Sequence, residues 1–168
     1  NFLHFNNSDQ FLCCLPLTHV GGLAVLVRAL IYGFSINLSK SFSSELIYQL
    51  LSKDPITIVS LVPTMLQRII ERPKGLKYLK SLRAILLGGG PTSSSLLNLC
   101  LQENLSIVKT YGMTETCSGV VGLWLKEQQH KKHFAGEPFR DVKIEIKNKE
   151  IIISGPMVMK GYLNNVDC

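Results

Sequence analysis

The segment Tyr111–Thr116, of sequence YGMTET, carries the side chains best suited to hold a nucleotide and a metal ion. An aromatic ring can stack on a base, a hydroxyl can donate to a phosphate, and a carboxylate can hold Mg²⁺. Tyr111, Thr114 and Glu115 are therefore candidates for these three roles. The structural alternative is that Thr114 caps a helix and Glu115 lies in its first turn, where the helix dipole favours a carboxylate. Composition alone does not separate the two readings.

A second candidate is the run Gly88-Gly89-Gly90-Pro91-Thr92, which follows an apolar strand-like segment. Glycine is needed where a ligand approaches the backbone closely, and the start of a helix supplies unpaired N–H groups. The spacing is not the G-x-G-x-x-G of dinucleotide-binding folds. A plain tight turn explains the three glycines equally well.

A third candidate lies in the segment 15–22, of sequence LPLTHVGG, where His19 precedes two glycines. A single histidine beside apolar residues is usually structural, but the glycines leave room for a ligand around it. Arg28 follows nine residues later. Either its long side chain reaches solvent or it faces an acid.

These segments require a scaffold, and the hydrophobic pattern predicts an α/β fold. Apolar runs rich in branched residues, which alternate with segments of helical period, read as strands buried on both faces of a mostly parallel sheet flanked by helices. We predict strands at 11–15, 35–38, 57–61, 84–87 and 106–110, and helices at 22–32, 42–52, 63–72 and 93–103. Ser41 or Ser43, and Thr92 or Ser93, are the expected N-caps, and Pro63 opens its helix. Open sheets of this kind bind ligands at the carboxyl ends of their strands, where all three candidate segments lie.

The pattern changes from about Lys143. Residues 142–146 alternate apolar and charged side chains, Asn148-Lys149 forms a turn, and Ile151–Ile153 follows, which predicts a β-hairpin. We therefore expect an α/β subdomain over about 1–134 and the start of a β-rich subdomain over about 135–168.

Composition excludes several classes of protein. The chain is 46% hydrophobic and 18% charged, which is typical of a globular domain. Its net charge of +6 comes from scattered residues, so we expect no nucleic-acid partner. The longest apolar stretch, 20–34, is interrupted by Arg28 and is too short to span a membrane. Five cysteines without C-x-x-C spacing are expected to be free thiols in a reducing compartment.

Six stretches, in order, resemble the motifs of the adenylate-forming, AMP-binding superfamily, which includes acyl-CoA synthetases, luciferases and adenylation domains. YGMTET resembles its Y-G-x-T-E signature. The others are PLTHVGG, VPTML, GGGP, AGEPF and EIIISGPMVMKGYLNN. The resemblance covers essentially the whole chain. Within the superfamily, stretches such as GGLAVLVRALIYGF and YGMTETCSGVV look most similar to the o-succinylbenzoate–CoA ligases of menaquinone and phylloquinone synthesis.

The resemblance implies an enzyme that activates a carboxylic acid with ATP and Mg²⁺ and transfers it to CoA. In that scheme Thr114, Glu115 and His19 are catalytic, and Glu115 holds the metal. The expected ATP or AMP site comprises Gly88, Gly89, Gly90, Pro91, Tyr111, Gly112, Met113 and Thr114. The acyl and CoA side comprises His19, Ser60, Val62, Gly112 and Ser118. Another acyl- or aryl-CoA synthetase, or a nucleotide- or acyl-binding module without catalysis, remains an alternative.

The resemblance also implies parts that these residues do not contain. A phosphate-binding loop with a lysine is expected upstream, a ribose-binding aspartate shortly after Tyr162, and a small C-terminal domain with a catalytic lysine beyond it. We therefore expect no ligase activity from these 168 residues alone. Lys149 stands where the family commonly has glycine, so the hairpin turn must be formed through Asn148 or in some other way. The expected location is the cytoplasm, or the plastid stroma in a photosynthetic eukaryote.

Overall fold

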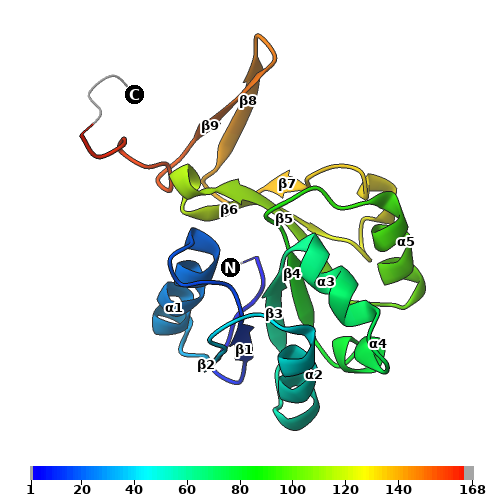
Figure 1. The fold of residues 1–168 in the computed structure, drawn as a ribbon. Coiled ribbons are helices and arrows are strands. Elements are labelled where there is room, and N and C mark those ends of the chain that lie inside the picture. The colour runs from blue at the N-terminus through cyan, green and yellow to red at the C-terminus, as the bar shows by residue number, and fades with distance from the viewer. Residues whose placement is uncertain (1, 165–168) are drawn as a thin grey trace.

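The computed structural model describes residues 2–164, in which one large sheet carries helices on both faces (Figure 1). The strands are β1 (Gln10–Cys13), β2 (Ser35–Leu38), β3 (Ile58–Leu61), β4 (Ala84–Leu87), β5 (Ile107–Met113), β6 (Ser118–Trp124), β7 (Glu137–Pro138), β8 (Lys143–Lys147) and β9 (Glu150–Ser154). The helices are α1 (Val20–Tyr32), α2 (Ser44–Lys53), α3 (Pro63–Ile70), α4 (Gly75–Leu79) and α5 (Ser94–Gln102), with 3₁₀ turns η1 (Thr114–Thr116) and η2 (Gln129–Lys131).

Seven strands form the main sheet in the order β2-β1-β3-β4-β5-β6-β7. The first five of these in space are parallel, and β6 and β7 pair antiparallel at the other end. Each parallel connection passes through a helix, as parallel strands require. The predicted mostly parallel α/β sheet is confirmed.

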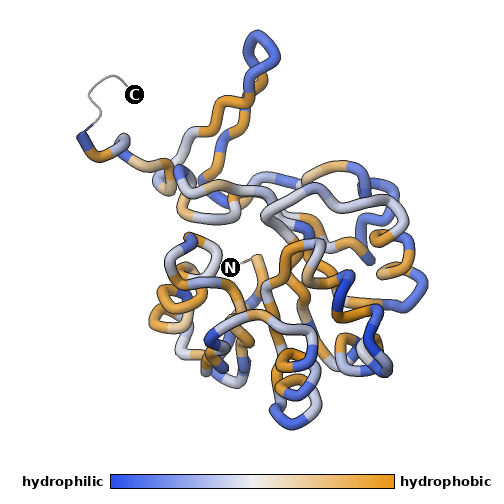
Figure 2. The backbone as a smooth tube through the Cα atoms, in the orientation of Figure 1, coloured by the Kyte–Doolittle hydropathy of each residue, from blue (hydrophilic) through white to orange (hydrophobic). Residues whose placement is uncertain are grey.

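Two apolar clusters cover the two faces of this sheet. One gathers side chains of α2, α3, α4 and α5 over one face, and the other gathers α1 and the segment before β1 over the opposite face. Figure 2 shows the apolar colour concentrated along the strands between these layers. Cys13 and Cys14 point into different clusters, as expected for neighbours in extended chain. Among the described helices, none has the length and apolar character needed to cross a membrane.

Local signals set most helix ends. The Ser43 side chain accepts a hydrogen bond from the Leu46 N–H, and the Ser93 side chain accepts one from Leu96, so these two residues are the N-caps of α2 and α5. Pro63 opens α3 as predicted, because its fixed φ suits the first helical turn. Gly33 ends α1 in the left-handed conformation, at a φ of 74°.

Four features differ from the predicted elements. β5 does not end at Thr110 as predicted: it continues through Tyr111, Gly112 and Met113. No helix follows it, since the chain turns through η1 and returns as β6. Strands β6 and β7 and the short helix α4 were not predicted. The glycines in β6 and the five-residue length of α4 leave little periodic signal in either.

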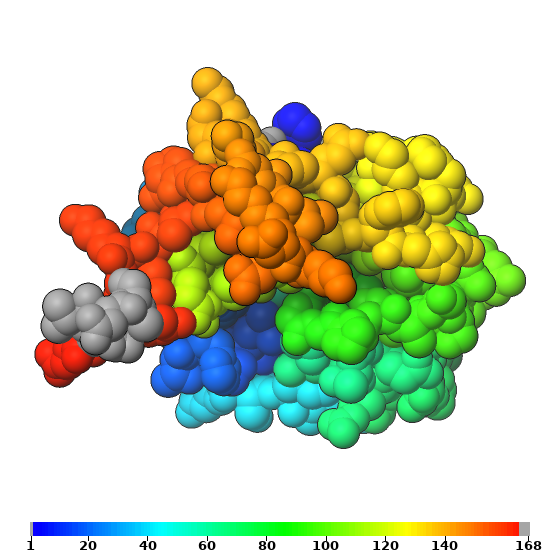
Figure 3. Space-filling view, turned by 90° about the horizontal axis from the view of Figure 1, so that it is seen from above, coloured from blue at the N-terminus to red at the C-terminus, as the bar shows by residue number. Residues whose placement is uncertain are grey.

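The predicted hairpin is present as β8 and β9, joined through Asn148 and Lys149. Both turn residues have positive φ, of 53° and 69°. Positive φ at both central residues is typical of the type I′ turn, whose twist matches that of the two strands of a hairpin. Lys149 therefore adopts the left-handed conformation that glycine would favour. The hairpin forms its own two-stranded sheet and projects from the main sheet (Figure 1). In the view from above, it lies in front of the main sheet (Figure 3). A subdomain boundary near residue 134 remains a prediction.

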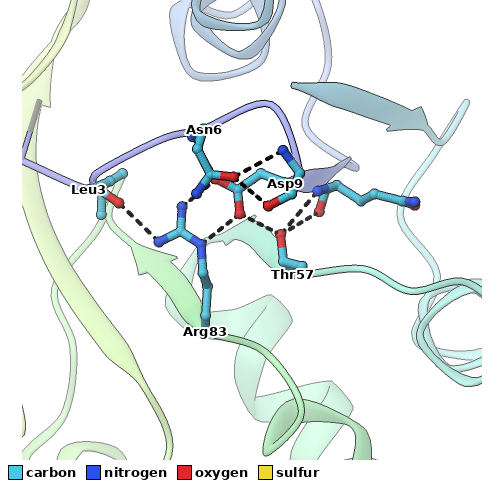
Figure 4. Close-up of polar contacts among 7 residues, drawn as sticks. Leu3, Asn6, Asp9, Thr57 and Arg83 are labelled. Carbon is cyan, nitrogen blue, oxygen red and sulfur yellow. Dashed lines mark hydrogen bonds and ion pairs between the residues drawn. The ribbon is translucent and has the colours of Figure 1, made fainter. Parts of the chain in front are cut away.

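The amino ends of three central strands are held by a polar cluster around Asp9, which is 2% exposed (Figure 4). Arg83, just before β4, donates from Nε and Nη2 to the two carboxylate oxygens of Asp9 at 2.6 and 2.5 Å. Thr57, just before β3, donates its hydroxyl to the same carboxylate at 2.9 Å. The Arg83 guanidinium also donates to the Leu3 carbonyl at 2.9 Å. The cluster thereby connects the N-terminal segment with β1, β3 and β4.

Asp9→Asn is expected to destabilise the fold by about 3 kcal/mol, the lower end of the range for breaking a buried ion pair, because Arg83 is one-third exposed. Burial raises the pKa of Asp9, but hydrogen bonds from Arg83, Asn6 and Thr57 outweigh it, so the pKa lies below its ordinary value. This stabilisation is therefore present above about pH 4 and lost as pH falls through the folded-state pKa.

Urea denaturation of the parent and variant at pH 7 and pH 3 tests this prediction. The difference in unfolding free energy should shrink at pH 3. Glu150→Gln, an exposed substitution in the hairpin, is the control and should leave the unfolding free energy within about 0.5 kcal/mol. An Asp9→Asn variant as stable as the parent at pH 7 would contradict the assignment.

Candidate functional site

Most of the predicted site residues lie at the carboxyl ends of the parallel strands or in the turns that follow them, and Ser118 begins β6. β1 leads to His19, β3 to Val62, β4 to Gly88 and β5 to Thr114. Because β1, β3, β4 and β5 are parallel, these turns emerge on the same edge. This edge lies at the top of Figure 1, on the side from which the hairpin projects.

The glycines after β4 contact two neighbouring strands. A methyl group at Gly88 would lie 2.4 Å from Thr110 Oγ1, and one at Gly89 would lie 3.2 Å from Val62 Cγ1. Gly89 also has a φ of 76°, which favours glycine. Gly90 is different, since its nearest neighbour, Pro63 Cδ, is 3.9 Å away. Thus Gly88 and Gly89 permit close packing between turns, whereas Gly90 is exposed and sterically open.

Gly112 is the most crowded position of the site. A Cβ there would lie 1.8 Å from the Ser118 carbonyl oxygen, where β5 and β6 pair across an irregularity between Tyr111 and Gly112. Only a residue without a side chain fits without moving one of these backbones. The structure therefore brings Gly112 and Ser118 together, as two of the residues predicted for the acyl side.

The turn after Gly112 is fixed by Thr116, which is buried. Its hydroxyl accepts from the Met113 N–H at 3.1 Å and lies 3.0 Å from the Ser118 carbonyl oxygen. Thr114 does not cap a helix, because Met113 occupies the cap position and η1 lasts three residues. The capping alternative for Thr114 is therefore wrong, and its exposed side chain is available at this edge.

Glu115 is held from a distant part of the chain. The Tyr162 hydroxyl donates to Glu115 Oε1 at 2.6 Å, and the Met159 N–H donates to the Glu115 carbonyl at 2.8 Å. The hydrogen bond from Tyr162 is the main cause that lowers the pKa of the Glu115 carboxyl, so it is ionised at neutral pH. Sequence reasoning did not assign Tyr162 to the site; the G-Y pair of its motif was the available signal.

The surroundings of Glu115 fit Mg²⁺ in one particular way. Within residues 2–164 there is no group of three or more His, Cys, Asp or Glu side chains that could enclose a metal. Mg²⁺ usually keeps several waters and binds one or two carboxylates together with substrate phosphates. One ionised carboxylate on an accessible turn, beside the Thr114 hydroxyl, matches that requirement.

The residues predicted for the acyl side are less closely gathered. His19 occupies the N-cap position of α1, where its exposed side chain makes no capping hydrogen bond. Ser60 is buried in β3, and Val62 precedes α3. Helix α1 packs against β6, which begins at Ser118, so these two elements border the same region. The described residues show no hydrogen bond between His19 and either serine.

Arg28 lies on α1 and is half-buried. Burial lowers the pKa of its guanidinium. None of the ion pairs among residues 2–164 includes Arg28, so the described structure places no acid against it. Its side chain reaches solvent only in part. A guanidinium in this position can donate hydrogen bonds to an anionic group of a ligand.

A family model described as AMP-binding enzyme matches residues 1–163. The chain belongs to the AMP-binding enzyme family. The sequence motifs that resemble this family include YGMTET, GGGP and PLTHVGG. In the structure these three segments lie at one edge of the sheet. Gly112 of the first motif lies against Ser118.

Relatives within the family share much of the sequence. A 2-succinylbenzoate–CoA ligase of Listeria monocytogenes is 36% identical over 97% of this chain and 35% of its own length. One of Bacillus licheniformis is 38% identical over 97% of this chain and 36% of its own length. The chain thus spans about a third of the curated relatives that it matches.

Solved structures show the same fold. The o-succinylbenzoate–CoA synthetase of Bacillus subtilis, in complex with the acyl-adenylate intermediate, is 33% identical with a TM-score of 0.87, covering 99% of this chain and 36% of that one. The same enzyme has been solved with ATP and magnesium ion. A fatty acyl-CoA synthetase of Mycobacterium tuberculosis, 21% identical over 95% of this chain and 34% of that one with a TM-score of 0.84, shares the fold.

Gly112→Ala is expected to destabilise the protein by about 3 kcal/mol, the upper end of the range for overpacking, because the new methyl group meets rigid backbone. Gly90→Ala is the matched control, since open space surrounds it, and should change stability by less than about 0.5 kcal/mol. Urea denaturation of both variants measures the difference. Equal effects would show that the crowding at Gly112 is relieved by backbone movement.

Proposed function

We propose that the complete protein containing this chain is an AMP-forming acid–CoA ligase whose substrate is o-succinylbenzoate. One observation carries the proposal. YGMTE and GGGP lie at the same edge of the sheet, in a chain whose relatives of 34–38% identity are named 2-succinylbenzoate–CoA ligases. The partners of the reaction are small molecules, namely ATP, CoA and the carboxylic acid. No nucleic acid takes part.

The reaction has two steps in the same site. The substrate carboxylate attacks the α-phosphorus of ATP, forming the acyl-adenylate and releasing pyrophosphate. The CoA thiol, having lost its proton, then attacks the acyl carbon as the thiolate, the acyl–phosphate bond breaks, and AMP leaves. Both steps move negative charge among oxygens, so positioning and electrostatic stabilisation supply most of the catalysis.

The turns after β4 and β5 hold the nucleotide in this proposal. Gly88, Gly89 and Pro91 shape this wall of the adenine site, Gly90 leaves open space for the base, and the half-buried ring of Tyr111 stacks on it. Gly112 and Met113 continue the wall beside the base. Thr114, whose side chain is not used in a helix cap, donates its hydroxyl to the α-phosphate.

Glu115 holds Mg²⁺ together with phosphate oxygens of ATP. When bound, the metal offsets negative charge on the phosphates and stabilises the charge that develops as pyrophosphate leaves. The carboxylate is ionised at neutral pH, as metal binding requires, because the hydrogen bond from Tyr162 lowers its pKa.

The acyl group lies between the start of α1 and the start of β6. His19, Ser60, Val62 and Ser118 line this region, and Gly112 borders it where β5 packs against the backbone of β6. The second carboxylate of o-succinylbenzoate does not react and needs a partner, because an unpaired buried carboxylate is costly. Arg28, half-buried and without an acid beside it in the described structure, supplies that charge.

In the complete enzyme, Glu115→Gln should slow adenylation by about 10²–10³-fold, as for the loss of a group that stabilises the transition state. Thioester formation from supplied acyl-adenylate should fall by less than about tenfold, since it does not release pyrophosphate. The two half-reactions are measured separately by pyrophosphate release and by CoA consumption. Glu150→Gln is the control for removal of an exposed carboxylate. Equal losses in both half-reactions would favour a structural role for Glu115.

The complete enzyme should prefer o-succinylbenzoate over a medium-chain fatty acid or a cinnamate by at least about tenfold in kcat/KM. Arg28→Gln should reduce this preference by weakening recognition of the second carboxylate, whereas Lys53→Gln, an exposed substitution at the end of α2, should leave it unchanged. Steady-state kinetics with the three acids provide the test. A preference for the fatty acid or the cinnamate would reject o-succinylbenzoate while leaving acid–CoA ligation in place.

A further inference from the structure

The segment after the hairpin is attached to η1 at one residue, Glu115. Met159 donates its backbone N–H to the Glu115 carbonyl at 2.8 Å, and Tyr162 donates its hydroxyl to Glu115 Oε1 at 2.6 Å. A turn closed by the Val158 N–H and the Gly155 carbonyl at 3.2 Å precedes these contacts. One backbone bond and one side-chain bond thus fix both ends of the same glutamate.

This arrangement matters because Glu115 has few other constraints. It lies on a three-residue turn, and three rotatable bonds separate its carboxylate from the backbone. A neutral phenol hydroxyl is a donor that adds no positive charge to compete with a metal. The hydrogen bond from Tyr162 engages Oε1 and leaves the carboxylate its negative charge, so Glu115 can still bind a cation.

We propose that Tyr162 is a positioning residue that holds the Glu115 carboxylate in the orientation in which it binds the divalent metal. This inference rests on the proposed function of Glu115. Tyr162 touches neither the metal nor the substrate; it acts through the carboxylate. Its segment therefore contributes to the metal site although forty-six residues of sequence lie between it and Glu115.

The test uses the full-length enzyme with Tyr162→Phe, which keeps the ring and removes the hydroxyl. Mn²⁺ binding in the presence of α,β-methylene-ATP is measured by electron paramagnetic resonance. The variant should bind Mn²⁺ about threefold to tenfold more weakly, as expected for loss of one hydrogen bond to a charged group in a partly exposed position. AMP affinity without metal and the melting temperature should not change.

Four further variants separate the possible failures. Glu115→Gln should weaken Mn²⁺ binding more than Tyr162→Phe, and adding Tyr162→Phe to it should have no further effect. Replacing Tyr162 by 4-aminophenylalanine, which keeps a donor, should restore affinity. Tyr78→Phe, which removes another hydrogen-bonded hydroxyl far from the site, should leave Mn²⁺ binding unaltered.

Unchanged or tighter Mn²⁺ binding by Tyr162→Phe, with Glu115→Gln still impaired, would overturn the positioning role and leave the metal role of Glu115 intact. Normal Mn²⁺ binding by Glu115→Gln would overturn both. A parallel loss of metal-free AMP binding and thermal stability in Tyr162→Phe would show a structural contact instead.

Discussion

A buried carboxylate needs a charged partner, and the pairing of Asp9 with Arg83 organises the amino edge of this sheet. Through Arg83 and Thr57 the pair joins the starts of β1, β3 and β4. These strands have four residues each, so about 13 Å separates the ion pair from the turns that leave the opposite edge. An error in strand register at one edge would displace the site at the other. The ion pair therefore stabilises the geometry of the site without belonging to it.

Sterics at the carboxyl edge explain why glycine occurs in both main motifs. Gly88 packs on Thr110, which belongs to the strand that carries Tyr111, and Gly112 packs on the backbone of β6. A side chain at either position would separate the two turns that lie together. In the GGGP and YGMTET segments, glycine thus serves contact between strands as well as access for a ligand. Gly90, which has open space, is the position where ligand access is the better physical reason.

Much of the fold followed from local pattern, because buried parallel strands are continuous apolar runs and helix starts carry capping residues such as Ser43 and Ser93. The site was less accessible to this reasoning. Strand β6 contains glycines and returns antiparallel, so its pairing with β5 depends on tertiary contact. Tyr162 and Glu115 are hydrogen-bonded, but the hairpin lies between them in the sequence. Local sequence patterns do not indicate where that hairpin lies relative to the main sheet. The sequence linked the two residues only through the family resemblance, because each lies in one of the family's motifs. The resemblance assigned no role to Tyr162.

The projecting hairpin has one consequence for handling this chain. Within the described residues neither β8 nor β9 pairs with a further strand, and Ile146, Ile151 and Ile152 are exposed. On β8, Lys143, Glu145 and Lys147 form ion pairs along the strand and oppose the approach of another chain. β9 has three consecutive isoleucines and only Glu150 as a charge. In a concentrated preparation of these 168 residues, the free edge of β9 is therefore where intermolecular strand addition, and with it precipitation, would begin.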